Sequence, residues 1–279
     1  MSRPTRLAAA AAARLAEAGV PSPRVDAELL LAEALRIDRG RIPIADDATD
    51  EQAAAYEALI TRRAQREPLQ HILGRVHFGP VELRVGPGVF VPRPETELLA
   101  VWAAQQAGRG ATIVDLCAGS GAVGLYLAAA VPDSRVLLVE RDEAALDYLL
   151  ANAQGSTATV LAADVREPGL VEKIEAELGT VDLVVANPPY IPDGAPLDRE
   201  AAADPQGALF SGADGLDLIR ALAPVSARLL RAGGAVGIEH DDSNGAGTAA
   251  ALRGAGFGAV EQHRDLADRP RFVTGRIEP

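Results

Sequence analysis

Acidic side chains accompany the ends of three consecutive apolar stretches. Asp115 lies in TIVDL, Glu140 ends RVLLVE, and Asp164 ends TVLAAD. Short runs rich in Val, Leu and Ile are typical of buried strands, and open parallel sheets bind ligands at the carboxyl ends of their strands. We therefore expect the three carboxylates to meet at one edge of a sheet, with solvated acids in ordinary turns as the alternative.

The glycine-rich loop AGSGAVG permits two interpretations. Gly119, Gly121 and Gly124 match the G-x-G-x-x-G pattern of dinucleotide-binding proteins, with Glu140 as the acid for a ribose. Asp115 argues against that interpretation, because a carboxylate beside a pyrophosphate would be repelled. A cationic ligand suits it better. The D-x-x-x-G-x-G spacing resembles the cofactor loop of class I methyltransferases, whose cofactor S-adenosylmethionine is cationic and carries no phosphate.

S-adenosylmethionine would give each of these residues a role. Asp115 would attract the positive methionine end, and the glycines would let the backbone approach closely. Glu140 would accept hydrogen bonds from both ribose hydroxyls. Asp164 would lie near the adenine amino group, with Val165 against the ring. The product would be S-adenosylhomocysteine.

The stretch VVANPPYIP ends a fourth apolar run with an asparagine, two prolines and a tyrosine. Two adjacent prolines fix two φ angles and keep the preceding residues out of the helical region, so the turn is rigid. The side-chain oxygen of Asn187 and the carbonyl of Pro188 can each accept one hydrogen of a planar NH₂ group, while Tyr190 packs over it.

A nitrogen attached to an sp² carbon is a poor nucleophile because its lone pair is delocalised. Two fixed acceptors would favour a more pyramidal nitrogen and stabilise the positive charge that develops during in-line methyl transfer. No strong general base is needed, since the proton can leave after transfer. The NPPY motif is shared by enzymes acting on adenine N6, cytosine N4 and glutamine N5, so by itself it leaves the substrate open.

The elements that position these residues differ along the chain. Residues 1–67 predict helices only, with a cap and proline at Ser22–Pro23 and capping-box spacing between Thr49 and Gln52. Residues 68–93 are rich in Gly, Pro and Val and predict a hairpin and a linker. In residues 94–279, strands and helices alternate, which predicts a parallel sheet with right-handed crossovers and a catalytic α/β domain. The last two strand-like segments follow closely and predict a hairpin.

Composition narrows the possible classes. The chain has 279 residues, a net charge of −12 and a single cysteine. No apolar run is long enough to span a bilayer, and the N-terminal alanine tract is typical of a helix rather than a signal peptide. We expect a cytoplasmic monomer without a membrane association. The negative charge argues against a broad nucleic-acid groove.

Five segments, in order, resemble the bacterial release-factor glutamine methyltransferase family: REPLQHILGRVHF, VGPGVFVPRPETELL, VDLCAGSGAVGL, VVANPPYIP and ALFSGADGLDLIR. The resemblance runs from Glu67 onward, and PRPETE at 92–97 is its most specific part. It implies an α/β class I methyltransferase with a mostly parallel, seven-stranded, Rossmann-like sheet and a small helical N-terminal domain for substrate recognition. It also implies methylation of the side-chain N5 of the glutamine in the Gly-Gly-Gln loop of peptide chain release factors, which modulates translation termination.

The resemblance also implies the site residues. The residues implied to hold the glutamine are Asn187, Pro188, Pro189 and Tyr190. The residues implied to contact the cofactor are Cys117, Ala118, Gly119, Ser120, Gly121, Glu140, Val165 and Asn187.

Three positions depart from the family pattern. Cys117 stands where glycine is frequent, so we expect a turn without positive φ there and a buried, inert thiol. Glu140 stands where aspartate is common, and its longer arm should still reach a ribose. After AVGIE the family shows glycine, whereas this chain has His240, Asp241 and Asp242. We expect a solvated loop there and no metal site. The histidines that we expect to be structural are His71, His77 and His263.

Four alternatives compete with this interpretation. An adenine-N6 or cytosine-N4 methyltransferase would need a basic cleft and a pocket for a flipped base. The same chemistry could act on another protein's glutamine. A nicotinamide-dependent dehydrogenase would leave Asp115 and the NPPY motif unexplained, and a catalytically silent adaptor would not need Asn187.

Overall fold

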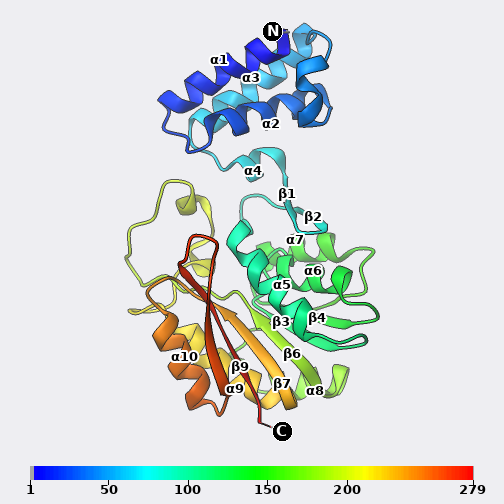
Figure 1. Ribbon diagram of the computed structural model, residues 1–279, viewed down its shortest axis with the longest axis vertical. Coiled ribbons are helices and arrows are strands. Elements are labelled where there is room, and N and C mark those ends of the chain that lie inside the picture. Colours follow the sequence, from blue (N-terminus) through cyan, green and yellow to red (C-terminus); the bar gives the residue numbers. More distant parts are fainter. Residues whose placement is uncertain (1–2, 279) are drawn as a thin grey trace. The chain divides into compact units, whose positions relative to one another are not determined.

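The computed structural model describes residues 3–278, which form two compact units. One unit contains the chain up to residue 75 together with residues 197–203 (Figure 1). The other contains residues 76–196 and the chain from residue 204 onward. The expected domain limits at residues 67 and 93 stay a prediction. No helix among the described residues is long and apolar enough to cross a membrane.

The first unit is helical, as predicted. Its helices are α1 (Arg3–Glu17), α2 (Pro23–Leu35), the 3₁₀ helix η1 (Arg39–Ile44), α3 (Asp50–Ala64) and α4 (Leu69–Leu73), and residues 197–203 add η3 (Ala201–Ala203). Leu15, Leu30, Leu31 and Ile60 are fully buried between the helices. The apolar faces of α1, α2 and α3 therefore form a small core of their own.

Helix starts in this unit follow local sequence signals. The predicted capping box is present at α3, where the Gln52 N–H donates to Thr49 Oγ1 at 3.2 Å and the Thr49 N–H donates to Gln52 Oε1 at 3.0 Å. Pro23 lies in the first turn of α2, as predicted, but the Ser22 side chain makes no capping hydrogen bond there. The fixed φ of proline is thus the stronger of the two signals at α2.

The second unit contains two sheets. The hairpin predicted from the Gly-, Pro- and Val-rich segment is confirmed as the sheet of β1 (Arg75–Phe78) and β2 (Val81–Arg84). The larger sheet has seven strands in the order β5-β4-β3-β6-β7-β9-β8. Its strands are β3 (Thr112–Leu116), β4 (Arg135–Glu140), β5 (Thr159–Ala162), β6 (Val181–Ala186), β7 (Leu230–Glu239), β8 (Gly258–Arg264) and β9 (Pro270–Arg276).

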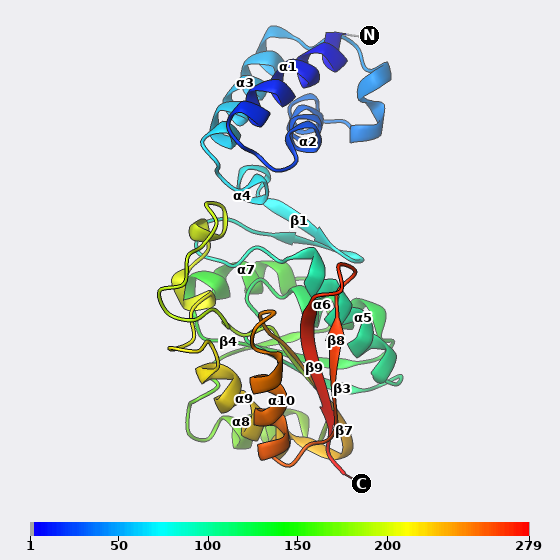
Figure 2. The same ribbon diagram turned by 60° about the vertical axis from the view of Figure 1, so that its left-hand side comes forward.

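The seven-stranded sheet is mostly parallel, which confirms the predicted fold class. Strands β3 to β7 pair in parallel, and β9 runs antiparallel to both β7 and β8. The antiparallel pair β8–β9 is the C-terminal hairpin that the sequence predicts (Figure 2).

Helices cover both faces of this sheet (Figure 1). They are α5 (Glu97–Gln106), α6 (Ala122–Ala130), α7 (Glu143–Ala153), α8 (Leu170–Leu178), α9 (Asp217–Leu229) and α10 (Gly245–Gly254), and the same unit contains the 3₁₀ helices η2 (Pro94–Thr96) and η4 (Gln206–Ala208). Val114 and Val139 pack in one apolar cluster with α8, α9 and α10, whereas Ile113 and Leu138 pack in another with α5, α6 and α7. Near-continuous apolar strands are therefore required, because both faces are buried.

The register aligns the carboxyl ends of neighbouring strands. Leu116 lies beside Val139 of β4 and beside Ala186 of β6. Ala186 in turn lies beside Ile238 of β7. The residues that end or follow these strands are consequently brought to one edge of the sheet, where a ligand site is expected.

Candidate active site

Asp115 is buried beneath the glycine-rich loop. It is 1% exposed, and its Oδ2 accepts the backbone N–H of Gly124 at 2.8 Å, which fastens the first turn of α6 to β3. The pKa of Asp115 is raised to about 7, chiefly by burial and also by the negative charge of Glu140, while the Gly124 N–H opposes the shift. A cation placed at this edge would stabilise the ionised form of Asp115.

The loop after β3 turns through left-handed backbone at Cys117, Gly119 and Gly121, with φ values of 66°, 57° and 92°. The expectation that Cys117 avoids positive φ is therefore wrong. For a non-glycine residue this conformation costs about 1–2 kcal/mol. The neighbouring Ala118 N–H donates to Val139 O at 3.0 Å, so the loop is held against β4 in spite of that cost.

The Cys117 thiol is partly buried and packs against the core cluster of α8, α9 and α10. Burial raises its pKa well above the usual value, and the negative charges of Glu140 and Asp115 act in the same direction. Because the thiolate is the reactive form of cysteine, the raised pKa disfavours reaction at Cys117, and the expected inertness of the thiol stays a prediction.

Glu140, at the end of β4, is joined directly to the loop. Its Oε2 accepts the Gly119 N–H at 2.8 Å, and its Oε1 accepts the N–H groups of Arg141 and Asp142 at 2.8 and 2.9 Å. A Cβ added at Gly119 would meet no atom within 4 Å. The structure thus brings Glu140 and the loop together beside open space.

Asn152 of α7 also fastens the loop, which the sequence did not reveal. Its Nδ2 donates to the carbonyl of the buried Ser120 at 2.9 Å and to the carbonyl of Arg84 at 3.0 Å. Its Oδ1 accepts the Arg84 N–H at 2.8 Å. A lone asparagine inside a helical pattern carries no signal for such a contact, because the partners are distant in sequence.

Asp164 lies two residues beyond β5 and is engaged by cations. Burial alone would raise its pKa, but the Arg166 N–H and the guanidinium groups of Arg166 and Arg141 lower it below the usual value. The Arg166 N–H lies 2.9 Å from Oδ1, and Arg141 Nη1 lies 3.1 Å from Oδ2. Asp164 is therefore ionised, and any adenine amino group would share it with two arginines.

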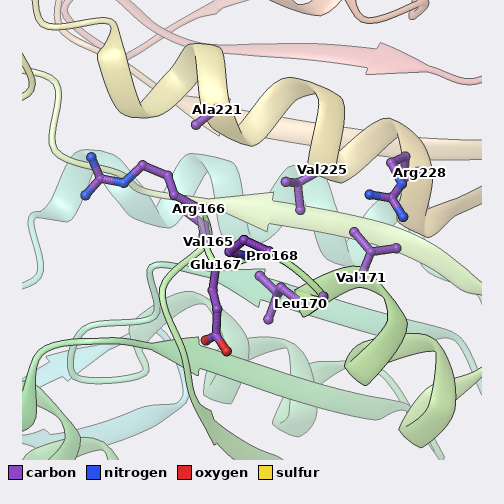
Figure 3. A pocket seen from close by; sticks show the side chains of 10 residues that line it. Val165, Arg166, Glu167, Pro168, Leu170, Val171, Ala221, Val225 and Arg228 are labelled. Atoms are coloured by element: carbon purple, nitrogen blue, oxygen red, sulfur yellow. The ribbon is translucent and has the colours of Figure 1, made fainter.

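Val165 is buried and lines a pocket of about 310 Å³ between the loop that follows β5 and helix α9. Figure 3 shows Ala221 and Val225 on α9 opposite Pro168 of that loop and Leu170, the first residue of α8. Val165 is the only residue of this lining that the sequence assigned to the cofactor. The other lining residues had no expected role in cofactor binding, and Asp115, Glu140 and the glycine loop do not line this pocket.

The NPPY turn follows β6 directly. Pro188 and Pro189 are buried, and the N–H groups of Tyr190 and Ile191 both donate to Leu209 O, at 3.1 and 2.8 Å. Asn244 Nδ2 donates to Tyr190 O at 2.8 Å. Backbone contacts on both sides thus fix the turn, as its two prolines lead one to expect.

Thr96 and Glu239, both 1% exposed, adjoin this turn and were missed by the sequence assignment. Asn187 Nδ2 donates to Thr96 Oγ1 at 3.3 Å, and the Tyr190 hydroxyl donates to Glu239 Oε1 at 3.3 Å. Glu239 ends β7 as Glu140 ends β4, so the signal of an acid at a strand end was present. Thr96 lies within PRPETE, but its contact depends on how α5 packs against the sheet.

The segment after β7 is not the solvated loop that was expected. His240 is fully buried, and its Nδ1 lies 2.7 Å from the carbonyl oxygen of Asp241. Burial lowers the pKa of His240, so the ring is neutral. Asp242 alone is exposed, and it pairs with Arg271 at 3.2 Å. Residues 3–278 contain no cluster of three or more side chains suited to a metal ion.

The other histidines differ in their surroundings. His263 stacks on Phe272 with ring centroids 4.5 Å apart, and its Nε2 lies 2.9 Å from Thr274 Oγ1, so it is structural as predicted. His71 is buried in the helical unit. His77 is an exposed residue of β1 that lies 3.4 Å from Glu82, so it contributes little to the core.

Two protein families match the chain. The PrmC N-terminal domain family matches residues 6–74, and the methyltransferase small domain family matches residues 83–202. Among solved structures, a methyltransferase from Pyrococcus furiosus superposes with a TM-score of 0.53 over 72% of this chain and 91% of that chain. Its sequence is 15% identical, so this similarity concerns the fold.

Curated relatives are similar over nearly the whole chain. The release factor glutamine methyltransferase of Mycolicibacterium smegmatis is 53% identical over 268 residues, covering 95% of this chain and 94% of that protein. The protein of the same name from Mycobacterium tuberculosis strain H37Rv is 46% identical over 271 residues, covering 95% and 88%. With the NPPY turn and the glycine loop at one edge of a mostly parallel sheet, this chain belongs to the release factor glutamine methyltransferase family.

Proposed function

We propose that this protein transfers a methyl group from S-adenosylmethionine to the side-chain N5 of the glutamine in the Gly-Gly-Gln loop of peptide chain release factors. The observation that carries the proposal is the rigid turn at Asn187 and Pro188, fixed beside the acid- and glycine-lined edge of the sheet. The membership of the chain in the family supports the choice of glutamine over a nucleobase.

The residues at this edge fit the proposed cofactor. The loop from Cys117 to Gly121 leaves space in front of Gly119, where no side chain intrudes. Asp115 beneath the loop and Glu140 beside Gly119 supply negative charge, which favours a ligand that carries a sulfonium and an ammonium. When bound, S-adenosylmethionine supplies an electrophilic methyl group. In this arrangement Glu140 would hold the ribose, Val165 and Asp164 the adenine, and Asp115 would favour the methionine end.

The residues of the NPPY turn would orient the glutamine side chain. Asn187 Oδ1 and the Pro188 carbonyl accept the two hydrogens of the substrate amide, and Pro189 and Tyr190 confine its plane. These acceptors lie on a turn whose backbone is already fixed, so little reorganisation is needed during transfer. The proton departs after the nitrogen has been methylated, and the chain supplies acceptors rather than a strong base.

The partner that we propose is a class I release factor, bound by a monomer in the cytoplasm. A single glutamine side chain offers too little surface for selection, so other parts of the release factor must contribute contacts. The helical unit, which matches the PrmC N-terminal domain family, is our candidate for those contacts. The net charge of −12 disfavours a nucleic-acid duplex as the alternative substrate.

The test is mass spectrometry of a purified release factor incubated with this protein and S-adenosylmethionine. We expect a single methyl group on the glutamine of the Gly-Gly-Gln loop, and none when that glutamine is replaced by alanine. Transfer to DNA or RNA oligonucleotides but not to the release factor would overturn the proposal.

Asn187→Ala tests the role of the turn. We expect turnover to fall by roughly 10²–10³-fold, because one acceptor of the substrate amide is lost, while cofactor affinity by calorimetry stays within a few-fold. Asp193→Ala, an exposed position in the following loop, is the matched control and should behave as wild type. Wild-type turnover by Asn187→Ala would refute the assigned role.

A further inference from the structure

Glu239 is a buried carboxyl group that the proposed mechanism does not yet use. It ends β7, and the pairing of Ala186 with Ile238 places it beside Asn187 at the edge of the sheet. The Tyr190 hydroxyl donates to its Oε1 at 3.3 Å, and the neighbouring Thr96 side chain lowers the pKa of this carboxyl. Its Oε2 is buried and accepts no well-aligned hydrogen bond from residues 3–278.

When Glu239 is ionised, it determines which groups donate and which accept in the hydrogen bonds around it. A carboxylate only accepts hydrogen bonds, so the Tyr190 hydroxyl must donate to it, and the neighbouring Thr96 hydroxyl can engage it only as a donor. The Thr96 hydroxyl has one hydrogen, and once that hydrogen points to Glu239 its oxygen can only accept. The Asn187 amide then has to turn its NH₂ toward Thr96, which agrees with the 3.3 Å contact from Nδ2 to Oγ1.

The direction of these hydrogen bonds decides which atom Asn187 offers to a substrate. With its nitrogen engaged by Thr96, the amide presents Oδ1 on its other side. A substrate amide NH₂ requires an acceptor there, and a flipped Asn187 would present a second donor instead. The orientation of one side-chain amide is thus the difference between a complementary and a repulsive contact.

We propose that Glu239 is a positioning residue, which acts through Thr96 to hold Asn187 Oδ1 toward the substrate nitrogen. The inference rests on the proposed function, in which Asn187 Oδ1 accepts a hydrogen of the substrate amide. It adds two residues, Thr96 and Glu239, that reach the substrate only through Asn187.

The protonation state of Glu239 sets the conditions of the test. Its pKa is raised to about 7, chiefly by burial and also by Glu95, against the lowering effects of Thr96, Arg271 and Tyr190. At pH 8 the carboxyl is therefore mostly ionised and can act only as an acceptor toward the two hydroxyls. Assays of methyl transfer to the release factor are best performed at that pH.

Two conservative variants interrupt the series of contacts from Glu239 through Thr96 to Asn187 at different points. In Glu239→Gln, the new amide can donate to Thr96, whose hydroxyl is then free to donate to Asn187 Oδ1 and turn the amide over. Thr96→Val keeps the shape of the side chain but removes the hydroxyl. For both we expect kcat to fall roughly 10- to 100-fold, the range that loss of a buried polar contact produces, with the affinity for S-adenosylmethionine and the melting temperature near wild type.

Two further variants serve as controls. Thr96→Ser keeps the hydroxyl and should restore most of the wild-type kcat. Glu261→Gln makes the same chemical change as Glu239→Gln at an exposed position of β8 and should have no effect on kcat. If activity were sensitive to the loss of any carboxylate on the sheet, Glu261→Gln would lower kcat as well.

A double-variant cycle separates this inference from the proposed function. In an Asn187→Ala background, single-turnover rates should not fall further when Glu239→Gln is added, because the residue through which Glu239 acts is gone. If the wild-type protein methylates no release factor, the proposed function fails, and if Asn187→Ala alone keeps wild-type turnover, the acceptor role of Asn187 is wrong. If Asn187→Ala is impaired but Glu239→Gln and Thr96→Val keep wild-type kcat, or if Glu239→Gln slows the Asn187→Ala protein by the same factor as wild type, the positioning role of Glu239 is wrong.

Discussion

At the scale of single residues, Asp115 and Glu239 are two carboxyl groups almost completely removed from water. Each is 1% exposed, and burial raises the pKa of each to about 7. Neither has an ion pair, within the described part of the chain, close enough to cancel that shift. A site built to receive a cation can tolerate such a carboxyl, because the ligand restores the ionised form when it binds.

Asp115 should make the protein without cofactor less stable as the pH rises. Its pKa increases from the ordinary value of 3.8 to about 7 in the folded chain, so between these values the folded state holds a proton that the unfolded state has lost. The contribution is complete below about pH 4 and is lost as the pH rises through 7. The free energy of unfolding changes by about 1.4 kcal/mol for each unit of difference between the two pKa values.

Asp115→Asn is the corresponding variant, since its amide oxygen can still accept the Gly124 N–H. In urea unfolding at pH 5 and pH 8, we expect its stability to decrease less between the two pH values than that of wild type. Asp147→Asn, on the exposed surface of α7, is the control and should keep the wild-type difference. Equal differences in Asp115→Asn and wild type would contradict the assigned pKa.

At the scale of elements, helices α2 and α3 begin with different devices although both are preceded by a hydroxyl residue. Thr49 forms both hydrogen bonds of a capping box with Gln52, whereas the Ser22 side chain makes none and Pro23 sets the first turn of α2. The free N–H groups at a helix start are stabilised only where a side chain reaches them.

Thr49→Ala should therefore destabilise the protein by about 1 kcal/mol, the usual value for loss of an N-cap. Ser22→Ala is the matched control and should change the free energy of unfolding by roughly 0.5 kcal/mol or less, since no capping bond is lost. Chemical denaturation followed by circular dichroism measures both. A larger decrease in the free energy of unfolding for Ser22→Ala than for Thr49→Ala would mean that the side-chain cap stabilises the start of α2 rather than that of α3.

At the scale of the whole molecule, a short segment that follows the NPPY turn in sequence is part of the helical unit. Residues 197–203 form one compact unit with the N-terminal helices. Glu200 of this segment lies 2.8 Å from Arg63 and 2.9 Å from Arg66, and Arg63 also pairs with the buried Asp26 at 2.7 Å. The Arg63 side chain is 3% exposed, so loss of one of its partners is costly.

Glu200→Gln should loosen residues 197–203, because two charge-assisted contacts are weakened together. The N–H groups of Ala202 and Ala203 donate within this segment, to Asp198 O and Glu200 O, and report on its opening. By hydrogen–deuterium exchange we expect these amides to exchange several-fold faster. Glu51→Gln, exposed in the first turn of α3, should leave them unchanged. Unchanged exchange in Glu200→Gln would mean that the segment is held by other contacts.

The sequence by itself determined the features that depend on neighbours along the chain. Alternating apolar and helical segments predicted the mostly parallel sheet. A Gly-, Pro- and Val-rich segment predicted the first hairpin, and the close succession of the last two strand-like segments predicted the second. The spacing of Thr49 and Gln52 predicted a capping box, and the two prolines after Asn187 predicted a rigid turn. In each case the interacting groups lie within a few residues, so local chemistry is sufficient.

Only the tertiary structure decided the features that depend on register and packing. The sequence predicted negative φ at Cys117 and a solvated His240, yet the first is left-handed and the second is fully buried. The contact of Thr96 with Asn187, and that of Glu239 with Tyr190, joins segments far apart in the sequence. Such contacts exist only after β7 has paired with β6 and α5 has packed on the sheet, and no local pattern encodes which buried side chains then meet.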